Sequence, residues 1–437
     1  MLFLASLLLF TACGEKDKNT INDNGQDVVN NENDREVENN DHNNDVGDDE
    51  AFTISAMEPT PFEEIAGKTA VKLNTADWSD PYDVEELRWK MYYGDNEFIT
   101  AAPDQGIFRY DLKNDETIWN IDGRVTEIMM HDGVLYAAQI EESNTYANVG
   151  TLDLKSGKLQ KLYEAKDYTI VTRLHFIDNL MLFAANLKDS NDNQEKDLIV
   201  YDLSSDSILW TKPVLGMHDQ PVVDLDENVL LVNEFEAGED RYETDETAYI
   251  YDKDTGEDKF NIVGTSIRKT PIVNNKGIYF ADFKNNIIQL FDFDGTLKTK
   301  LEPDIEFNHY QLIQPVATED AFIYADNEGI VWYDTELSTI QHRVELGDST
   351  IRYMVATEDR LFAIVSEKTE DSEENFYNIS LDLKTGEVFE KIALDTNENS
   401  IRADHVYNNK YHFAVIDVKN QKEVYYVFSS DVNKPLD

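Results

Sequence analysis

Residues 198–210 read LIVYDLSSDSILW, and residues 248–260 read AYIYDKDTGEDKF. In both stretches an apolar run ends in Tyr-Asp, a short polar turn follows, and a second run ends in an aromatic residue. Short apolar runs rich in Ile, Val and Tyr are typical of β-strands, and Asp, Ser, Thr and Gly are typical of turns. Each stretch therefore predicts two antiparallel strands joined by a tight turn.

The same pattern, an apolar or aromatic residue followed by Asp, recurs along the chain. Successive aspartates are separated by 42, 49, 50, 40, 42 and 48 residues. A period of about 45 residues with about four short strands is typical of a propeller blade, because one such sheet cannot bury both faces without neighbours. The seven dipeptides are Tyr110-Asp111, Leu152-Asp153, Tyr201-Asp202, Tyr251-Asp252, Phe291-Asp292, Tyr333-Asp334 and Leu381-Asp382.

We predict an all-β fold, a β-propeller of eight four-stranded blades over residues 67–437, with seven blades as the alternative if one unit is misread. The last unit, around EVYYVFSSDVNKPLD (423–437), holds three strands. The apolar run Thr69–Asn74 precedes the first full unit. We expect this run to supply the missing outer strand and close the ring, which removes open sheet edges.

The stretches GTLDLKSGKLQKL (150–162) and ISLDLKTGEVFEKI (379–392), with the two quoted above, resemble the pyrroloquinoline-quinone-type, or quinoprotein-type, propeller repeat. In that family an apolar residue and Asp are followed by two variable positions, Thr-Gly and then Trp. The glycine position is held by Gly157, Gly256 and Gly386, and the tryptophan position by Trp119 and Trp210. Blades one, three and six lack the glycine. The resemblance implies a propeller over about 350 residues.

The dehydrogenases of that family need a disulfide between adjacent cysteines and a calcium site. Cys13 is the only cysteine, so this chain cannot form that disulfide. Phosphate loops and nucleophile elbows do not occur, and the histidines lack metal-ligand spacing, although His405 and His412 lie in adjacent predicted strands. We therefore expect no cofactor, no metal site and no catalytic residue, and a protein that is not an enzyme.

Two turns, DKDTGED (252–258) and DFDGT (292–296), have the alternating oxygen-bearing residues of a calcium loop. Neither has the glutamate that such a loop requires in register. Capping of a hairpin turn by the aspartate side chain is the expected role instead.

The N-terminal run MLFLASLLLFTA (1–12) is apolar but too short to span a bilayer, which is typical of a signal peptide. The string Phe10-Thr11-Ala12-Cys13 resembles a bacterial lipobox, in which the cysteine is acylated. We expect a lipoprotein signal peptide over 1–13, lipidation of Cys13, and an extracytoplasmic protein anchored to the cell membrane. An ordinary cleaved signal peptide is the alternative.

Residues 14–50 contain 13 acidic and 3 basic side chains and almost no large apolar ones, so we predict an acidic, Asn- and Asp-rich disordered tether over 14–66. The chain has a formal net charge of −50, of which this stretch contributes −10, so residues 51–437 carry −40. Such a field repels nucleic acid and anionic lipid headgroups. The interpretations of the acidity that remain are a cationic partner, a neutral ligand or adaptation to a salty or alkaline habitat.

The longest insertions, 141–148, 188–197, 236–247 and 367–375, lie between the predicted second and third strands of their blades. In a propeller these connections emerge on one face, together with the connections between blades. Loops on a rigid scaffold commonly carry binding, so this acidic rim is the candidate recognition face. Its candidate binding residues are Asp189, Asp192, Glu195, Glu236, Glu239, Asp240, Glu243, Glu370 and Asp371.

The expected function is a non-catalytic, lipid-anchored scaffold that binds an unidentified protein or another macromolecule at the cell envelope. This expectation is an analogy with propeller lipoproteins that resemble the outer-membrane barrel-assembly lipoprotein, and fold does not by itself decide function. A receptor for a small ligand or a cation such as calcium is the alternative. An enzyme that acts on the envelope, for instance on cell-wall glycans, is the third hypothesis.

Overall fold

The computed structural model describes the chain between residues 53 and 429, apart from short gaps. The expected signal peptide, Cys13 and residues 14–52 of the expected tether lie outside the described residues, as do residues 430–437. The gaps are 67–69, 75–89, 95–96, 103–105, 112–113, 115, 141–145, 188–194, 216–222, 227–228, 236–244, 266–270, 283–284, 308–312, 314, 370–373, 395–398, 408 and 418–421.

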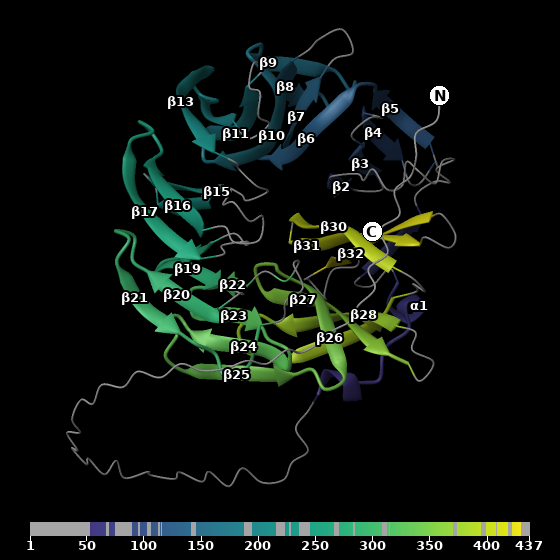
Figure 1. The fold of residues 1–437 in the computed structure, drawn as a ribbon. Helices are drawn as coiled ribbons and strands as arrows, with labels where there is room; N and C mark the ends of the chain where they lie inside the picture. Colours follow the sequence, from purple (N-terminus) through teal and green to yellow (C-terminus); the bar gives the residue numbers. More distant parts are fainter. Residues whose placement is uncertain are drawn as a thin grey trace, which may run out of the picture. The chain divides into compact units, whose positions relative to one another are not determined.

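The described strands form eight antiparallel sheets of four strands each, which we number as blades 1 to 8 in chain order (Figure 1). Blade 1 contains β2 (Lys90–Gly94), β3 (Glu97–Ala102), β4 (Gly106–Asp111) and β5 (Glu116–Ile121); blade 2 β6 (Arg124–His131), β7 (Val134–Ile140), β8 (Ala147–Leu152) and β9 (Leu159–Ala165); blade 3 β10 (Tyr168–Ile177), β11 (Leu180–Leu187), β12 (Glu195–Asp202) and β13 (Ser207–Leu215); blade 4 β14 (Val223–Asp226), β15 (Val229–Phe235), β16 (Asp245–Asp252) and β17 (Asp258–Thr265). Blade 5 contains β18 (Ile272–Asn274), β19 (Gly277–Asp282), β20 (Ile287–Phe291) and β21 (Leu297–Leu301); blade 6 β22 (Val316–Ala317), β23 (Ala321–Ala325), β24 (Gly329–Asp334) and β25 (Ile340–Glu345); blade 7 β26 (Ser349–Ala356), β27 (Arg360–Lys368), β28 (Glu374–Asp382) and β29 (Val388–Ala393); blade 8 β30 (Asn399–Tyr407), β31 (Lys410–Asp417), β32 (Lys422–Ser429) and β1 (Ala70–Asn74).

The sheets are arranged around a common centre, with fourth strands such as β13, β17, β21 and β25 at the periphery (Figure 1). First strands of neighbouring blades contact each other, among them β6 with β10, β14 with β18, and β30 with β2. The predicted all-β propeller is therefore confirmed. The eight described sheets equal the larger of the two expected counts, and the number of blades in the whole chain stays a prediction because parts of it lie outside the described residues.

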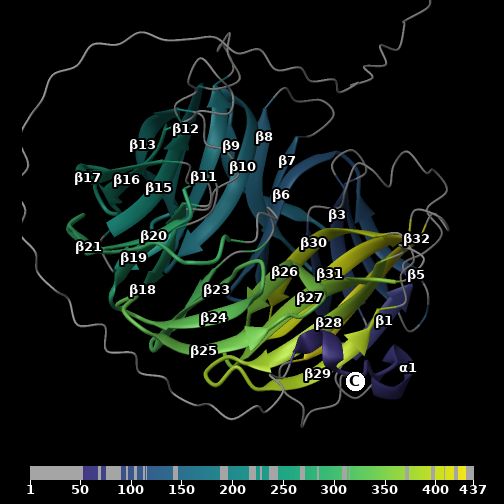
Figure 2. The same ribbon diagram turned by 60° about the horizontal axis from the view of Figure 1, so that its bottom comes forward.

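The ring is closed by the N-terminal strand, as the sequence predicted (Figure 2). β1 pairs antiparallel with β32, with Ala70 opposite Phe428 and Asn74 opposite Val424. It is the outermost strand of blade 8, whose other three strands come from the far end of the described chain. Strands distant in sequence thus share one sheet.

Blades 2 to 7 are buried on both faces, because alternate residues of a strand point to opposite sides. In β11, Phe183 and Ala185 belong to the apolar cluster shared with blade 2, whereas Leu182 and Ala184 belong to the cluster shared with blade 4. Among the described residues seven such clusters form, one between each pair of consecutive blades from 1 to 8. The core is therefore a ring of interfaces.

Consecutive blades are also joined at the turn between the third and fourth strands. Nε1 of Trp210, in blade 3, donates a hydrogen bond to O of Lys253 in blade 4 at 2.8 Å. The indole ring lies against Gly256 (φ +70°), where a Cβ would come within 2.7 Å of Trp210 Cδ2. Trp119 and Gly157 repeat the arrangement between blades 1 and 2. The tryptophan of one repeat therefore packs on the glycine turn of the next.

Other residues fill these positions where the repeat departs from its pattern. His342 packs against Gly386 in place of a tryptophan, between blades 6 and 7. In blades 3 and 6, which lack the glycine, Asp206 (φ 55°) and Leu337 (φ 57°) adopt the left-handed conformation. The left-handed conformation costs a residue with a Cβ about 1–2 kcal/mol of stability. The turn geometry is therefore retained even where the sequence does not favour it.

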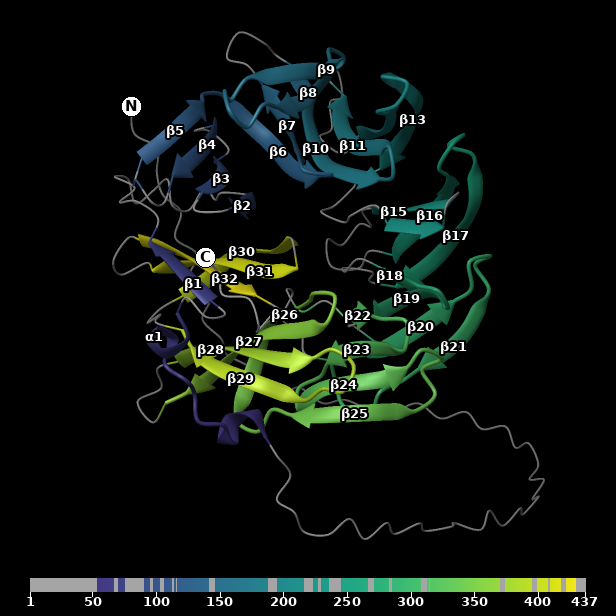
Figure 3. The same cartoon turned by 180° about the vertical axis from the view of Figure 1, so that it is seen from behind.

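Residues 53–66 correct the expected tether boundary at residue 66. This segment, here called the N-terminal strap, contains a 3₁₀ turn (Ile54–Ala56) and α1 (Phe62–Ile65), beside β28 and β29 (Figure 3). Its apolar residues Ile54, Phe62 and Ile65 are buried. No helix in the described part of the chain is long and apolar enough to cross a membrane. The three anchoring residues follow a long polar run, whose composition dominated the sequence prediction.

Replacing Gly256 with Ala is expected to lower the free energy of unfolding by about 2–5 kcal/mol, the sum of backbone strain and of crowding against Trp210. Gly133→Ala is the matched control, because Gly133 has φ +74° but nothing within 4 Å of an added Cβ. It should lose only the strain of about 1–2 kcal/mol. Urea unfolding measures both, and equal losses would show that the tryptophan contact contributes nothing.

Candidate recognition face

The two ends of the strands form two different faces of the propeller. The cap face holds the turns between first and second and between third and fourth strands. The loop face holds the connections between second and third strands and between consecutive blades. In blade 7, for example, the turn 383–387 after β28 lies on the cap face, and β27 ends at Lys368 on the loop face.

The repeat aspartates lie on the cap face and cap their own turns. Oδ1 of Asp252 accepts hydrogen bonds from N of Asp254 at 3.1 Å, N of Thr255 at 3.0 Å and Oγ1 of Thr255 at 3.1 Å. Nζ of Lys259 lies 2.9 Å from Oδ2, and its hydrogen bond is the largest of the contributions that lower the pKa of Asp252 to about 2. The same capping occurs at Asp153, Asp202, Asp334 and Asp382.

The capping role predicted for the two turns is therefore confirmed at 252–258, and at 292–296 Oδ1 of Asp294 accepts a hydrogen bond from N of Thr296 at 2.9 Å. Internal donors occupy the carboxylate oxygens that gave the turns their likeness to calcium loops. Within the described ranges, no three His, Cys, Asp or Glu side chains come together in a way that could hold a metal ion. His405 and His412 are directly opposite each other on β30 and β31.

Polar contacts also tie neighbouring blades together on the cap face. Nδ2 of Asn274 in blade 5 donates to O of Thr318 in blade 6 at 2.8 Å. N of Glu358 in blade 7 donates to Oδ1 of Asn409 in blade 8 at 3.0 Å. The described turns of this face are short and bound to one another, so the cap face serves the scaffold.

Eight of the nine candidate binding residues belong to connections between second and third strands, and the ninth, Glu195, begins a strand. Glu195 begins β12, where it pairs with Leu215. The strands that end at Leu187, Phe235 and Lys368 place the other eight between second and third strands, as the sequence predicted. Those eight lie outside the described residues, so their binding role stays a prediction: Asp189, Asp192, Glu236, Glu239, Asp240, Glu243, Glu370 and Asp371.

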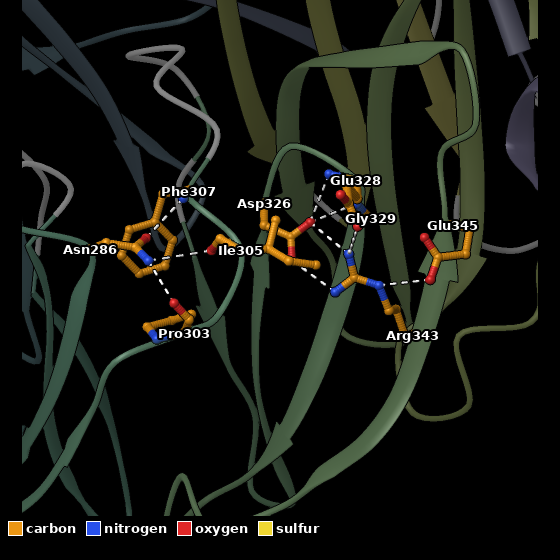
Figure 4. Close-up of polar contacts among 9 residues, drawn as sticks. All are labelled: Asn286, Pro303, Ile305, Phe307, Asp326, Glu328, Gly329, Arg343 and Glu345. Carbon is orange, nitrogen blue, oxygen red and sulfur yellow. Dashed lines mark hydrogen bonds and ion pairs between the residues drawn. The ribbon is translucent and has the colours of Figure 1, made fainter.

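On blades 5 and 6 the loop face is described in detail (Figure 4). Asn286, between β19 and β20, donates from Nδ2 to O of Pro303 at 2.7 Å and accepts at Oδ1 from N of Phe307 at 3.0 Å. The ring of Phe307 is fully buried. These contacts hold the connection from blade 5 to blade 6 against the face, with Asp304 and Glu306 exposed on it.

An ion pair organises the neighbouring turn of blade 6 (Figure 4). Both terminal nitrogens of Arg343 contact Asp326, at 2.8 and 2.9 Å, and Nε donates to Glu345 at 2.8 Å. Oδ1 of Asp326 also accepts from N of Glu328 and N of Gly329. Burial alone lowers the pKa of Arg343, but the hydrogen bond and charge of Asp326, followed by those of Glu345, raise it above its ordinary value. The Asp326 side chain is 1% exposed.

Two further cations near this face are paired in the same way. Arg352 contacts both oxygens of Glu374 at 2.9 Å, and Nζ of Lys391 lies 2.7 Å from Oε1 of Glu367. The Glu328 side chain, in contrast, is 65% exposed. Arg343, Arg352 and Lys391 are therefore paired with carboxylates, and Glu328, 3.9 Å from Arg343, is open to solvent.

Sequence reasoning did not identify Asn286, Asp326 or Arg343. Arg343 contacts an aspartate 17 residues earlier through the pairing of β24 and β25, for which no local pattern exists. A weak signal was present at the ends of the second strands, where Ala281-Asp282 and Ala325-Asp326 recur in blades 5 and 6. Recurrence at that position indicates a side chain that orders the loop-face turn.

No known family model matches this chain, and no curated protein matches its sequence. Among solved structures, Sqt1 from Saccharomyces cerevisiae is similar with a TM-score of 0.51 and 12% identity, over 83% of this chain and 98% of that one. BamB from Moraxella catarrhalis has a TM-score of 0.48 and 12% identity over 82% and 99%. Quinohemoprotein alcohol dehydrogenase from Comamonas testosteroni has a TM-score of 0.47 and 10% identity over 82% and 78%. The resemblance to the quinoprotein-type repeat is confirmed as a likeness of fold.

Arg343→Met is expected to lower the free energy of unfolding by about 3–5 kcal/mol, because it leaves the buried Asp326 carboxylate without its cation. The matched control is Lys300→Met, which breaks an exposed pair of 2.8 Å with Glu302 and should cost less than about 1 kcal/mol. Denaturant unfolding compares the two. A loss for Arg343→Met no larger than that of the control would contradict the assigned role of the ion pair.

The capping carboxylates predict a specific dependence of stability on pH. The pKa of Asp252 is about 2 in the folded protein against an ordinary value of 3.8, so ionisation favours the folded state above pH 3.8 and this contribution is lost as the pH falls toward 2. Asp252→Asn removes the titrating group. The gap in urea midpoint between wild type and Asp252→Asn should shrink between about pH 5 and pH 2. A gap that stays constant over this range would show that the carboxylate charge does not stabilise the turn.

Proposed function

We propose that this protein is a non-catalytic scaffold of the cell envelope that binds a partner protein through its loop face. The observation that carries this proposal is the difference between the two faces. Described cap-face turns are short, capped by their own aspartates and tied to each other, whereas the loop face carries the long insertions and a connection held flat by Asn286. Variable loops on a rigid scaffold are where recognition commonly occurs.

Charge indicates the chemistry of the partner. Residues 51–437 carry −40, and on blades 6 and 7 Arg343, Arg352 and Lys391 are each paired with carboxylates. The insertions add further acidic residues on the same face. A basic protein surface complements this arrangement and is drawn to it at long range, while nucleic acid is repelled.

An N-terminal anchor fits the same arrangement. The described chain begins at Thr53, which forms a β-bridge with Glu345 at the end of β25, on the loop face. If residues 14–52 form the predicted flexible tether, their root-mean-square span is about 35 Å. Lipidation of Cys13 would then hold the scaffold outside the cytoplasmic membrane, with its loop face able to reach partners at the membrane surface.

The test is affinity capture from membranes with three forms of the full chain. The first is the wild type, and the second is a loop-face variant in which Asp189, Asp192, Glu236, Glu239, Asp240, Glu243, Glu370 and Asp371 become Asn or Gln. The third is a matched cap-face variant with the same change at eight exposed carboxylates: Asp132, Asp254, Glu257, Glu319, Asp320, Glu336, Asp359 and Glu387. We expect the loop-face variant to lose at least about tenfold in partner recovery, and the cap-face variant to keep it.

Added salt should weaken capture by the wild type, because exposed charges are screened. Equal recovery by all three forms would refute the loop face as the recognition surface. Loss in both variants would mean that net charge rather than this face attracts the partner. A rise in melting temperature with calcium, removed in the loop-face variant, would support the cation receptor instead.

A further inference from the structure

The N-terminal strap is fixed to the propeller from outside, across three blades. Besides the bridge at Thr53, N of Ser55 donates to O of Leu346 at 3.1 Å, in the connection between blades 6 and 7. Thr60 then pairs with the free edge of β29, donating to O of Lys391 at 2.8 Å and accepting from N of Ala393 at 2.9 Å. The strap is thus attached by main-chain bonds at two places.

Its C-terminal end is held by aromatic packing. The ring of Phe62, in α1, lies edge-on to Tyr426 at 5.5 Å and to Phe428 at 6.4 Å between ring centroids. Both partners belong to β32, the strand that pairs with β1. Phe62 and Ile65 join the apolar cluster between blades 7 and 8. The strap and the closing strand therefore meet at the same strand of blade 8.

One buried cation connects the strap to blade 7. The Lys391 side chain is 1% exposed, and its Nζ donates to O of Ile54 at 3.2 Å, O of Met57 at 3.1 Å and Oε1 of Glu367 at 2.7 Å. An ammonium group has three N–H donors, and all three are used here. Two of the three acceptors are carbonyls of the strap. If the strap leaves, this charge loses most of its hydrogen bonds, so strap binding and the satisfaction of Lys391 are coupled.

The order of these contacts along the chain decides how a pull on the N-terminus is transmitted. β1 is a five-residue edge strand that pairs on one side with β32. Without the strap, a pull would act first on Ala70 and would peel β1 away, opening the ring at its closure. With the strap in place, the pull meets the bridge at Thr53 and the bonds of Lys391 first.

We propose that the N-terminal strap bears mechanical load. Force on the N-terminal segment is transmitted through the contacts of the strap, above all those of Lys391, into blade 7, and the closing strand β1 is protected from it. This role of the strap follows from the chain's own contacts and applies to any load on the N-terminus. Its failure in a test would leave the proposed loop-face recognition untouched.

The test is single-molecule pulling of the unacylated full chain, held at the thiol of Cys13, its only cysteine, and at the C-terminus. We expect a first rupture that releases residues 53–69, a gain in contour length of at most about 60 Å, before the ring opens. Lys391→Met should lower the force of this rupture or abolish it. The matched control Lys259→Met changes an exposed lysine on the fourth strand of blade 4 and should leave the rupture unchanged.

A second variant changes the strap and not the propeller, so it tests the proposal even if the Lys391→Met protein does not fold. Thr60→Pro removes the amide that donates to Lys391 and should weaken the first rupture too. Amide exchange at Ser55 should rise about tenfold in either variant. Opening of the wild-type ring in one step, or a first rupture unaffected by both substitutions, would overturn the proposal.

Discussion

Blades 2 to 7 of this protein hide apolar residues on both of their faces, and this constraint favours the ring. A sheet with one buried face needs one neighbour, but β11 sends Phe183 toward blade 2 and Leu182 toward blade 4, so blade 3 needs two. A linear row of such sheets leaves one apolar face exposed at each end. Closure removes both ends at once, which explains why the first described strand, β1, completes the last sheet instead of forming a sheet of its own.

The two faces of the ring are also constrained differently. The turns of the cap face must match their neighbours, since Trp210 fits onto Gly256 of the next blade and a Cβ there would clash. Any insertion in such a turn disturbs the interface. Connections on the loop face have no such partner in the repeat, so they can lengthen without opening the ring. The acidic insertions follow from this freedom, and the ion pair of Arg343 and Asp326 orders a place where the connection is short.

The parts of this structure that the sequence predicted are those encoded within one repeat or by recurrence of it. The Asp turns, the order of strands and the closing role of Ala70–Asn74 all follow from local patterns and their spacing. The strap was assigned to the tether because three apolar anchors in a polar stretch give little signal. Lys391 and Ile54 are 337 residues apart, and that contact exists only because blade 7 and the strap are brought together by closure. The candidate rim was predicted from the length and the acidity of the insertions, which is why the contacts of Asn286 and Arg343 on short turns were missed.

The outer strands of a propeller remain free edges, and several of them here carry paired charges. Lysines lie along them and pair with nearby carboxylates, as Lys212 does with Asp258 and Lys298 with Asp292. A lysine on an edge strand discourages pairing with another chain, because its charge would have to be desolvated. The edge of β29 is covered instead by Thr60 of the strap. Where an outer edge carries paired charges or is covered by the strap, pairing with an added strand is disfavoured. Recognition on the loop face, as we propose it, would leave these edge contacts and the cap-face contacts intact.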